Sequence, residues 1–148
     1  MKNQNYNATL AVSQTANEVF KNVNRVSKWW TENLEGNSEN LNDVFTLLWG
    51  GKSFVTIKII ESVPEKKVLW EVTDSYLEWL TDKMEWQNTK MSFEISTENN
   101  STTIHFTHIG LVPEVECYND CVKGWDQYIK GSLFKLITEG EGQPQKKK

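Results

Sequence analysis

The sequence is poor in the residues from which most reactive sites are built. It has two cysteines, two histidines and three prolines in 148 residues. Glycine-rich phosphate loops, serine nucleophile elbows and His-Glu-x-x-His zinc motifs are all missing from it. Its two histidines, His105 and His108, point to opposite faces of one predicted strand, so they cannot bind the same metal ion. We therefore expect no metal ion and no cofactor.

The two cysteines do not form a recognisable site either. Cys117 and Cys121 lie one turn apart on a predicted helix, where a disulfide is geometrically awkward, so we expect reduced thiols. Together with His108 they would give zinc three ligands, and no fourth ligand is apparent. No apolar run is long enough to span a membrane, and Met1–Asn5 lacks the apolar core of a signal peptide. These absences predict a cytoplasmic protein without a membrane span.

Positive charge is also scarce. The formal net charge is −4, which argues against nucleic acid as a partner. The only basic run is Lys146–Lys148, at the end of a tail from residue 141 that we expect to be solvated. A chain of this length suits a single domain, 1–148, with an ordered core from about residue 6 to residue 140.

What the chain does contain is a regular alternation of apolar and polar residues, which predicts β-strands. The expected strands cover about 6–12, 43–49, 53–60, 68–73, 86–96 and 102–108. Thr15–Glu18 has the pattern of a capping box and predicts a helix over about 16–25. Residues 32–42 predict a polar loop, and Gly50-Gly51 predicts a two-residue hairpin turn.

The last quarter of the chain predicts one long amphipathic helix, from Glu114 to about Gly140, with Pro113 at its start. Its apolar stripe consists of Tyr118, Cys121, Val122, Trp125, Ile129, Ser132, Leu133 and Leu136. A meander of antiparallel strands has one apolar face to cover, and this helix is the only element large enough to cover it. On the outer side of the helix, Phe134 either marks a weak homodimer contact or is an ordinary exposed residue of a monomer.

Aromatic residues are abundant, with seven tryptophans. They either fill a large core or line a pocket, and the two can coexist. Trp29 and Trp30 are adjacent on one helical turn, so one ring can face the core while the other faces a cavity or solvent. The segment 74–85 is too long for a hairpin turn and is either a flap packed on the sheet edge or a lid over a pocket.

The order of these elements resembles the START/Bet v 1-like superfamily, also called the SRPBCC or helix-grip fold. It is most similar to the group related to the C-terminal domain of the Hsp90 ATPase activator. The residues that carry the resemblance are Thr15–Phe20, Trp29-Trp30, Trp86–Thr89, Thr107–Pro113, Gly124-Trp125 and Ser132-Leu133. The resemblance implies an α+β helix-grip fold, β-α-α-β(5)-α, in which a curved antiparallel sheet wraps around a long C-terminal helix.

The resemblance also implies a cavity between sheet and helix that holds a small hydrophobic molecule. The alternatives are a module that interacts with an Hsp90-type chaperone and a polyketide cyclase-like or hydratase-like enzyme. For His108, the sequence favours a hydrogen-bonded structural role over a polar contact at the pocket mouth, and places a general acid or base last, because no carboxylate partner is evident. We expect a binding domain with no catalytic residues. The candidate ligand-binding residues are Trp30, Phe45, Trp49, Trp70, Trp79, Phe106, His108, Tyr118 and Trp125.

Overall fold

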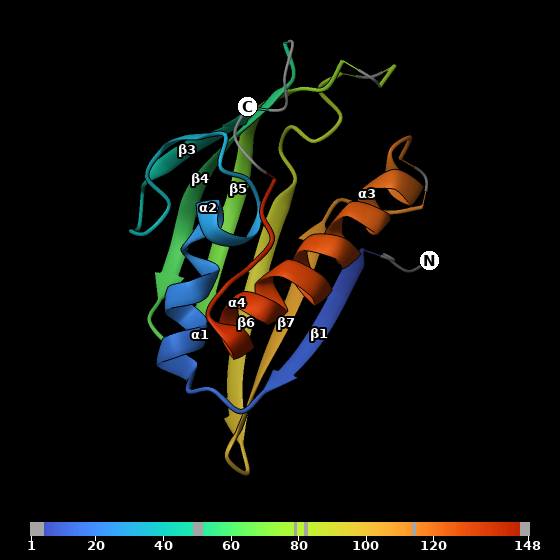
Figure 1. Ribbon diagram of the computed structural model, residues 1–148. Helices are drawn as coiled ribbons and strands as arrows, with labels where there is room; N and C mark the ends of the chain where they lie inside the picture. The colour runs from blue at the N-terminus through green and yellow to red at the C-terminus, as the bar shows by residue number, and fades with distance from the viewer. Residues whose placement is uncertain (1–4, 49–51, 79, 82, 114, 146–148) are drawn as a thin grey trace.

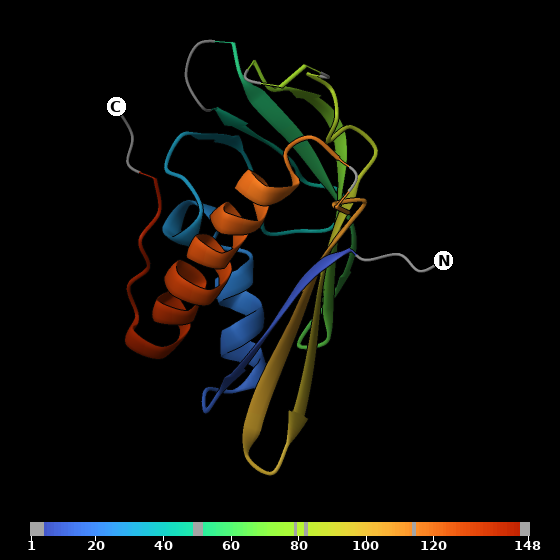
Figure 2. The same cartoon turned by 90° about the vertical axis from the view of Figure 1, so that its right-hand side faces the viewer.

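A computed structural model describes residues 5–48, 52–78, 80–81, 83–113 and 115–145. Within them, seven antiparallel strands form one curved sheet in the order β1-β7-β6-β5-β4-β3-β2 (Figure 1). The strands are β1 Tyr6–Val12, β2 Leu34–Gly36, β3 Val44–Leu48, β4 Phe54–Val63, β5 Lys67–Tyr76, β6 Lys90–Glu98 and β7 Ser101–Ile109. Figure 2 shows that the helices all lie on one side of this sheet. The α+β helix-grip architecture expected from the sequence is confirmed.

The inner face of the sheet is the one that the alternation predicted. In β4, β5, β6 and β7, every second residue is buried over most of the strand. The residues that face inward include 55, 57 and 59 in β4, 68, 70 and 72 in β5, and 104, 106 and 108 in β7. Register shifts between β4 and β5, at Thr56/Ile57 and Ile59/Glu61, disturb the ladder there. Such irregularities increase local twist and bend a sheet, which helps this one to curve around the helices.

Two short helices cover one end of the sheet. Helix α1, Ala16–Val23, begins with the expected capping box: the Thr15 hydroxyl accepts from the Glu18 amide, and the Glu18 carboxylate accepts from the Thr15 amide. Helix α2, Val26–Trp29, follows directly. Its last residue, Trp29, is fully buried and donates its indole N–H to the Val23 carbonyl at 3.1 Å.

The C-terminal helix runs without a break from residue 118 to residue 139. It comprises α3 Tyr118–Trp125, the π-helix η1 Asp126–Leu133 and α4 Phe134–Glu139, and it stops at Gly140, which has a φ of 84°. The predicted start at Glu114 was wrong by about one turn. The amides of Val115 and Tyr118 make tight turns to carbonyls three residues back, and those of Glu116 and Cys117 bond to the Glu85 carboxylate. These bonds take up the amides that an earlier helix would need.

Three further expectations need correction. The loop at 32–42 contains the short strand β2, which pairs with β3. Strand β6 begins at Lys90, because two turns at 84–89 and a left-handed Asn88, with a φ of 72°, interrupt the chain after Trp86. Phe134 is half-buried against the core, so it does not mark an exposed contact.

The Gly50-Gly51 turn lies outside the described residues. No helix in the described ranges combines the length and apolar content that crossing a bilayer requires.

Aromatic rings fill most of the space between sheet and helices. Trp29 lies nearly parallel to Trp70, with ring centroids 6.4 Å apart, and Phe93 packs edge-on against Trp70 at 4.8 Å. Phe106 contacts both Phe93 and Trp125 at 4.9 and 4.6 Å. The centre of the fold is therefore a packed aromatic core, and an apolar space lies beside it under the first turns of the C-terminal helix.

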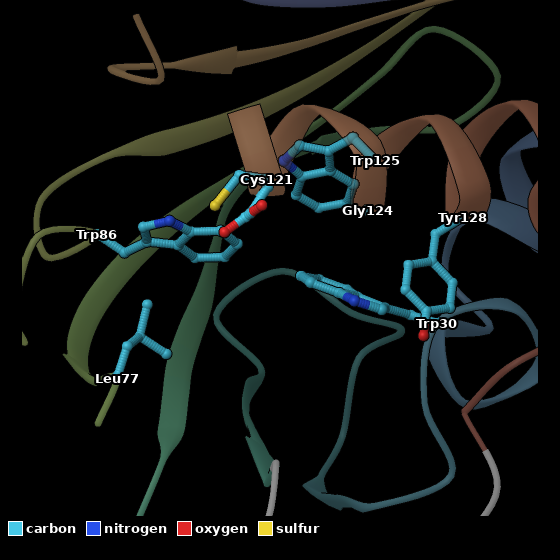
Figure 3. Close-up of a pocket in the computed structure, with 8 residues that line it drawn as sticks. Trp30, Leu77, Trp86, Cys121, Gly124, Trp125 and Tyr128 are labelled. Atoms are coloured by element: carbon cyan, nitrogen blue, oxygen red, sulfur yellow. The ribbon is translucent and has the colours of Figure 1, made fainter. Parts of the chain in front are cut away.

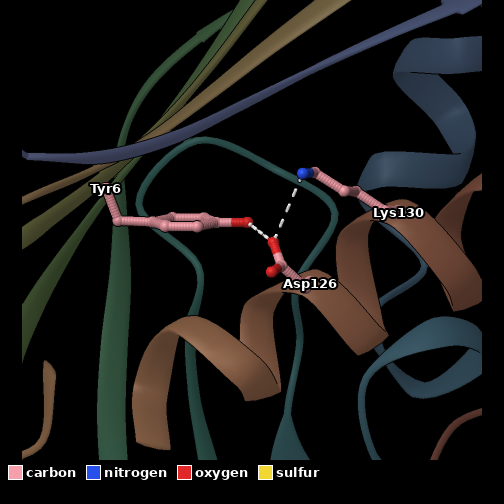
Figure 4. Close-up of polar contacts among 3 residues, drawn as sticks. All are labelled: Tyr6, Asp126 and Lys130. Atoms are coloured by element: carbon pink, nitrogen blue, oxygen red, sulfur yellow. Dashed lines mark hydrogen bonds and ion pairs between the residues drawn. The ribbon is translucent and has the colours of Figure 1, made fainter. Parts of the chain in front are cut away.

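A polar clamp joins β1 to the C-terminal helix on the far side of this core. The Tyr6 hydroxyl donates to the Asp126 carboxylate at 2.5 Å, and Lys130 forms an ion pair with the same carboxylate at 3.6 Å (Figure 4). Burial, and then the bond to Asp126, raises the pKa of Tyr6, so its hydroxyl remains a donor at neutral pH. The clamp fixes the point at which α3 passes into η1.

Replacing Tyr6 by phenylalanine is expected to lower the free energy of unfolding by about 1–1.5 kcal/mol, the usual net value of such a hydrogen bond. Urea denaturation at neutral pH measures it. Lys130→Ala is the control: its ion pair is half-exposed, so its loss should cost less than about 0.5 kcal/mol. Equal losses in the two variants would mean that the hydrogen bond from Tyr6 stabilises the fold no more than the half-exposed ion pair of Lys130 does.

Candidate functional site

An apolar pocket of about 170 Å³ opens beneath α3, between this helix, the end of α2 and the connection from β5 to β6 (Figure 3). Its walls are mostly aromatic side chains. The lining residues are Trp30, Leu77, Trp86, Asp120, Cys121, Gly124, Trp125 and Tyr128. The pocket is smaller than the roughly 300–1,000 Å³ of sites for drug-sized ligands, so it suits a molecule of about one ring.

One face of the C-terminal helix forms the roof. Cys121, Gly124, Trp125 and Tyr128 are three or four residues apart and therefore point to the same side. A β-carbon added at Gly124 would meet no atom within 4 Å. The absence of a side chain at Gly124 thus leaves room under the helix that any larger residue would occupy.

The connection between β5 and β6 supplies the opposite wall through Leu77 and Trp86. Hydrogen bonds fasten this segment to the start of α3: the Thr81 amide donates to the Glu116 carboxylate at 2.8 Å. The Glu85 carboxylate accepts from the Glu116 and Cys117 amides at 3.0 and 3.1 Å. Residues 77–78, 80–81 and 83–89 therefore form a wall that is anchored to the helix, and the hypothesis of a lid stays a prediction.

A buried histidine positions two of the indole walls. The Trp125 indole N–H donates to His108 Nδ1 at 3.0 Å, and an indole nitrogen can only donate, so Nδ1 carries no proton. The proton is therefore on Nε2, which lies 3.0 Å from the Thr89 hydroxyl; that hydroxyl in turn donates to the Trp86 carbonyl at 2.7 Å. His108 is fully buried, and burial lowers its pKa from 6.5 to about 3, so the ring is neutral at physiological pH.

The two cysteines form a disulfide, so the expectation of reduced thiols is corrected. Cys117 precedes the first turn of α3 and has a ψ of 0°, which frees it from helical geometry. The two Cα atoms are 5.6 Å apart, within the range that disulfides need. Cys117 Sγ is buried and accepts the Trp86 indole N–H at 3.3 Å, so the disulfide also holds a pocket wall. The cytoplasmic location stays a prediction.

The structure brings together two of the nine predicted ligand-binding residues, Trp30 and Trp125, at the pocket. The others that it describes lie elsewhere. Phe45, Trp70 and Phe106 are fully buried in the aromatic core, and His108 lies behind Trp125. Tyr118 begins α3 and packs partly against the core, outside the pocket lining. Trp49 and Trp79 fall outside the described residues. The ligand-binding role of the set stays a prediction.

Sequence reasoning missed six lining residues: Leu77, Trp86, Asp120, Cys121, Gly124 and Tyr128. Helical spacing around Trp125 was the available signal for Cys121, Gly124 and Tyr128, because all three share its face. The sequence predicts Trp86 at the start of a strand, whereas the structure places it in a turn before β6, so strand alternation gives no information about its neighbours. For the adjacent pair, the structure separates the two directions: Trp29 lies in the core, and Trp30 lines the pocket.

The sheet order, the two short helices and the long helix along the concave face define the SRPBCC, or Bet v 1-like, fold, and the chain has this fold. Among solved structures it is similar to the Aha1 dimer from Colwellia psychrerythraea. The two share 20% sequence identity at a TM-score of 0.71, over 93% of this chain and 98% of that chain. The sequence matches no protein-family model and no curated protein sequence.

Two further solved structures, DynU16 and CalU16, are also similar to this chain. DynU16, encoded in the dynemicin biosynthetic locus, has a TM-score of 0.70 and 14% identity over 95% of this chain, which spans 49% of DynU16. CalU16 from Micromonospora echinospora has a TM-score of 0.62 and 12% identity over 93% of this chain and 86% of that chain. At these identities the likeness establishes the fold alone.

Proposed function

We propose that this chain binds a small, largely apolar molecule in the pocket beneath α3. The observation that carries the proposal is the open space at Gly124, which is surrounded by the indoles of Trp30, Trp86 and Trp125. Aromatic walls with a few polar groups are typical of small-molecule sites. The network behind the walls supports the proposal further, because hydrogen bonds to Cys117 and His108 hold two of the three indoles in place.

Binding is favoured over catalysis by the state of His108. Both of its ring nitrogens are engaged in hydrogen bonds, and the ring is fully buried behind Trp125 rather than in the pocket. A general acid or base must reach the group whose proton it moves. The pocket lining contains no histidine, and neither the Asp120 carboxylate nor the Tyr128 hydroxyl is hydrogen-bonded to a described residue that would activate it, so the geometry favours binding.

Filling the pocket from Gly124 tests this function. In Gly124→Leu the new side chain enters the pocket, so we expect the affinity for a neutral apolar probe, tert-butylbenzene, to fall at least about tenfold in ligand-observed NMR. Stability should not fall, since the added β-carbon meets nothing within 4 Å and glycine in a helix costs about 1 kcal/mol.

Gly131→Leu is the matched control. Gly131 lies on the same continuous helix, also has open space around an added β-carbon, and is not part of the pocket lining. Its variant should bind the probe as the parent does. Undiminished binding by Gly124→Leu would contradict the proposal. Independently of these variants, native mass spectrometry of the gently purified protein would detect a small molecule that co-purifies with it.

A second candidate is an interaction module for an Hsp90-type chaperone, which the structural similarity to Aha1 favours. In this case the outer surface, and not the pocket, would carry the function. The similar Aha1 structure is a dimer, so a weak homodimer belongs to the same candidate. Stimulation of a chaperone's ATPase rate by this chain, unaffected by Gly124→Leu, is the expected result, and an unchanged rate would remove this candidate.

A further inference from the structure

We infer that the molecule bound beneath α3 is a small organic cation, such as an alkylated or aromatic ammonium compound. This inference rests on the proposed function and narrows it to one ligand class. It is carried by three features of the pocket: the aromatic walls, the bonding state of their N–H groups, and the charge of Asp120, which is the one acidic residue among the described lining residues.

Four of the eight lining residues are aromatic: Trp30, Trp86, Trp125 and Tyr128 (Figure 3). Trp86 and Trp125 are nearly parallel, with centroids 6.2 Å apart, and Trp30 is tilted against Trp125 at 4.8 Å. The faces of such rings carry partial negative charge and attract cations, with tryptophan attracting them most strongly. The walls therefore favour a positively charged ligand over a neutral one of the same shape.

Two of the three indole N–H donors in the lining are already bonded. The indole N–H of Trp86 is bonded to Cys117 Sγ, and that of Trp125 is bonded to His108. Neither a lysine nor an arginine lines the pocket within the described part of the chain. An anion in this space would face the negative faces of the rings without a compensating charge.

Asp120 supplies the negative charge that a cation needs. Asp120 lines the pocket as an exposed residue, and its carboxylate makes no hydrogen bond or ion pair with the described residues. The Tyr128 hydroxyl is likewise without a protein partner among them, and burial raises its pKa, so it stays neutral. Two further carboxylates lie close to the start of α3: Glu85 accepts from the Glu116 and Cys117 amides, and Glu116 accepts from the Thr81 amide. Lys83, in the same β5–β6 connection, adds a positive charge and is bonded to the Leu80 carbonyl.

The test compares two probes of the same shape, phenyltrimethylammonium and its neutral carbon analogue tert-butylbenzene. We expect the parent protein to bind the cation about tenfold more tightly, the preference that cation–π attraction and one carboxylate provide together. In Asp120→Asn this preference should fall to about threefold or less, while the affinity for the neutral probe stays the same.

Glu98→Gln is the matched control, because it removes the same charge from the end of β6, at the hairpin that lies far from α3 in Figure 1. This variant should keep the full preference at moderate salt. Equal affinities of the parent protein for the two probes would overturn the inference and leave the proposed function standing. If neither probe binds, or if both bind Gly124→Leu as they bind the parent, the proposed function fails as well.

Discussion

Acidification from about pH 7.5 to about pH 4.5 is expected to lower the free energy of unfolding by about 3 kcal/mol through His108 alone. The pKa of this ring is lowered from 6.5 to about 3 by burial. Between these two values the unfolded chain binds a proton that the folded chain does not bind, so stability rises with pH in this window and falls as the pH is lowered. Urea titrations at several pH values measure the slope.

The variant His108→Gln separates this effect from the titration of carboxylates. It removes the titrating ring. The slope of the free energy of unfolding against pH, between about pH 4.5 and pH 6.5, should therefore decrease by the contribution of about one proton. At neutral pH the variant should also be less stable by about 1–3 kcal/mol, because the Trp125 N–H loses its buried acceptor. His105→Gln, on the opposite face of β7, keeps the buried ring and should keep the slope. An unchanged slope in His108→Gln would contradict the assignment.

Truncation of Trp29 to alanine is expected to cost about 3–5 kcal/mol, the range for large aromatic side chains removed from a core. The ring is fully buried, lies parallel to both Trp30 and Trp70, and donates a hydrogen bond to the Val23 carbonyl. Domains of this size are commonly stable by about 5–15 kcal/mol. The variant should therefore unfold at a much lower urea concentration with an unchanged dependence on denaturant.

A matched pair of phenylalanine variants identifies the hydrogen-bond part of this loss. Trp29 and Trp70 are both fully buried, but the indole N–H of Trp70 has no hydrogen-bond partner among the described residues. Trp29→Phe leaves the Val23 carbonyl unpaired, whereas Trp70→Phe removes a donor that was already unpaired. We therefore expect Trp29→Phe to lower the free energy of unfolding by about 1–3 kcal/mol more than Trp70→Phe does. Equal losses would mean that the bond to Val23 contributes nothing.

Pocket and core are close neighbours in this protein, and the pair Trp29-Trp30 divides them. The same helical turn directs one indole into the packed centre and the other to the open space under α3. A change at Trp29 should therefore appear in stability, whereas a change at Gly124 should appear in ligand affinity. This separation allows binding to be altered without unfolding the chain.

The sequence by itself determined the fold class and the inner face of the sheet. Alternation at 55, 57 and 59 and at 104, 106 and 108 is a local property, because successive residues of a strand point to opposite faces whatever the rest of the chain does. The capping box at Thr15 and the apolar stripe around Trp125 are local in the same sense. These patterns were sufficient to predict a curved sheet covered by a long helix.

Only the tertiary structure decided where the long helix begins, which rings fill the core and which surround open space. The Glu85 carboxylate, distant in sequence, takes the amides of Glu116 and Cys117 and delays the start of α3. The position of Trp86 depends on turns and on bonds to Cys117 and Thr89, which no periodicity encodes. Packing of segments far apart along the chain thus created the pocket beneath α3, around Gly124.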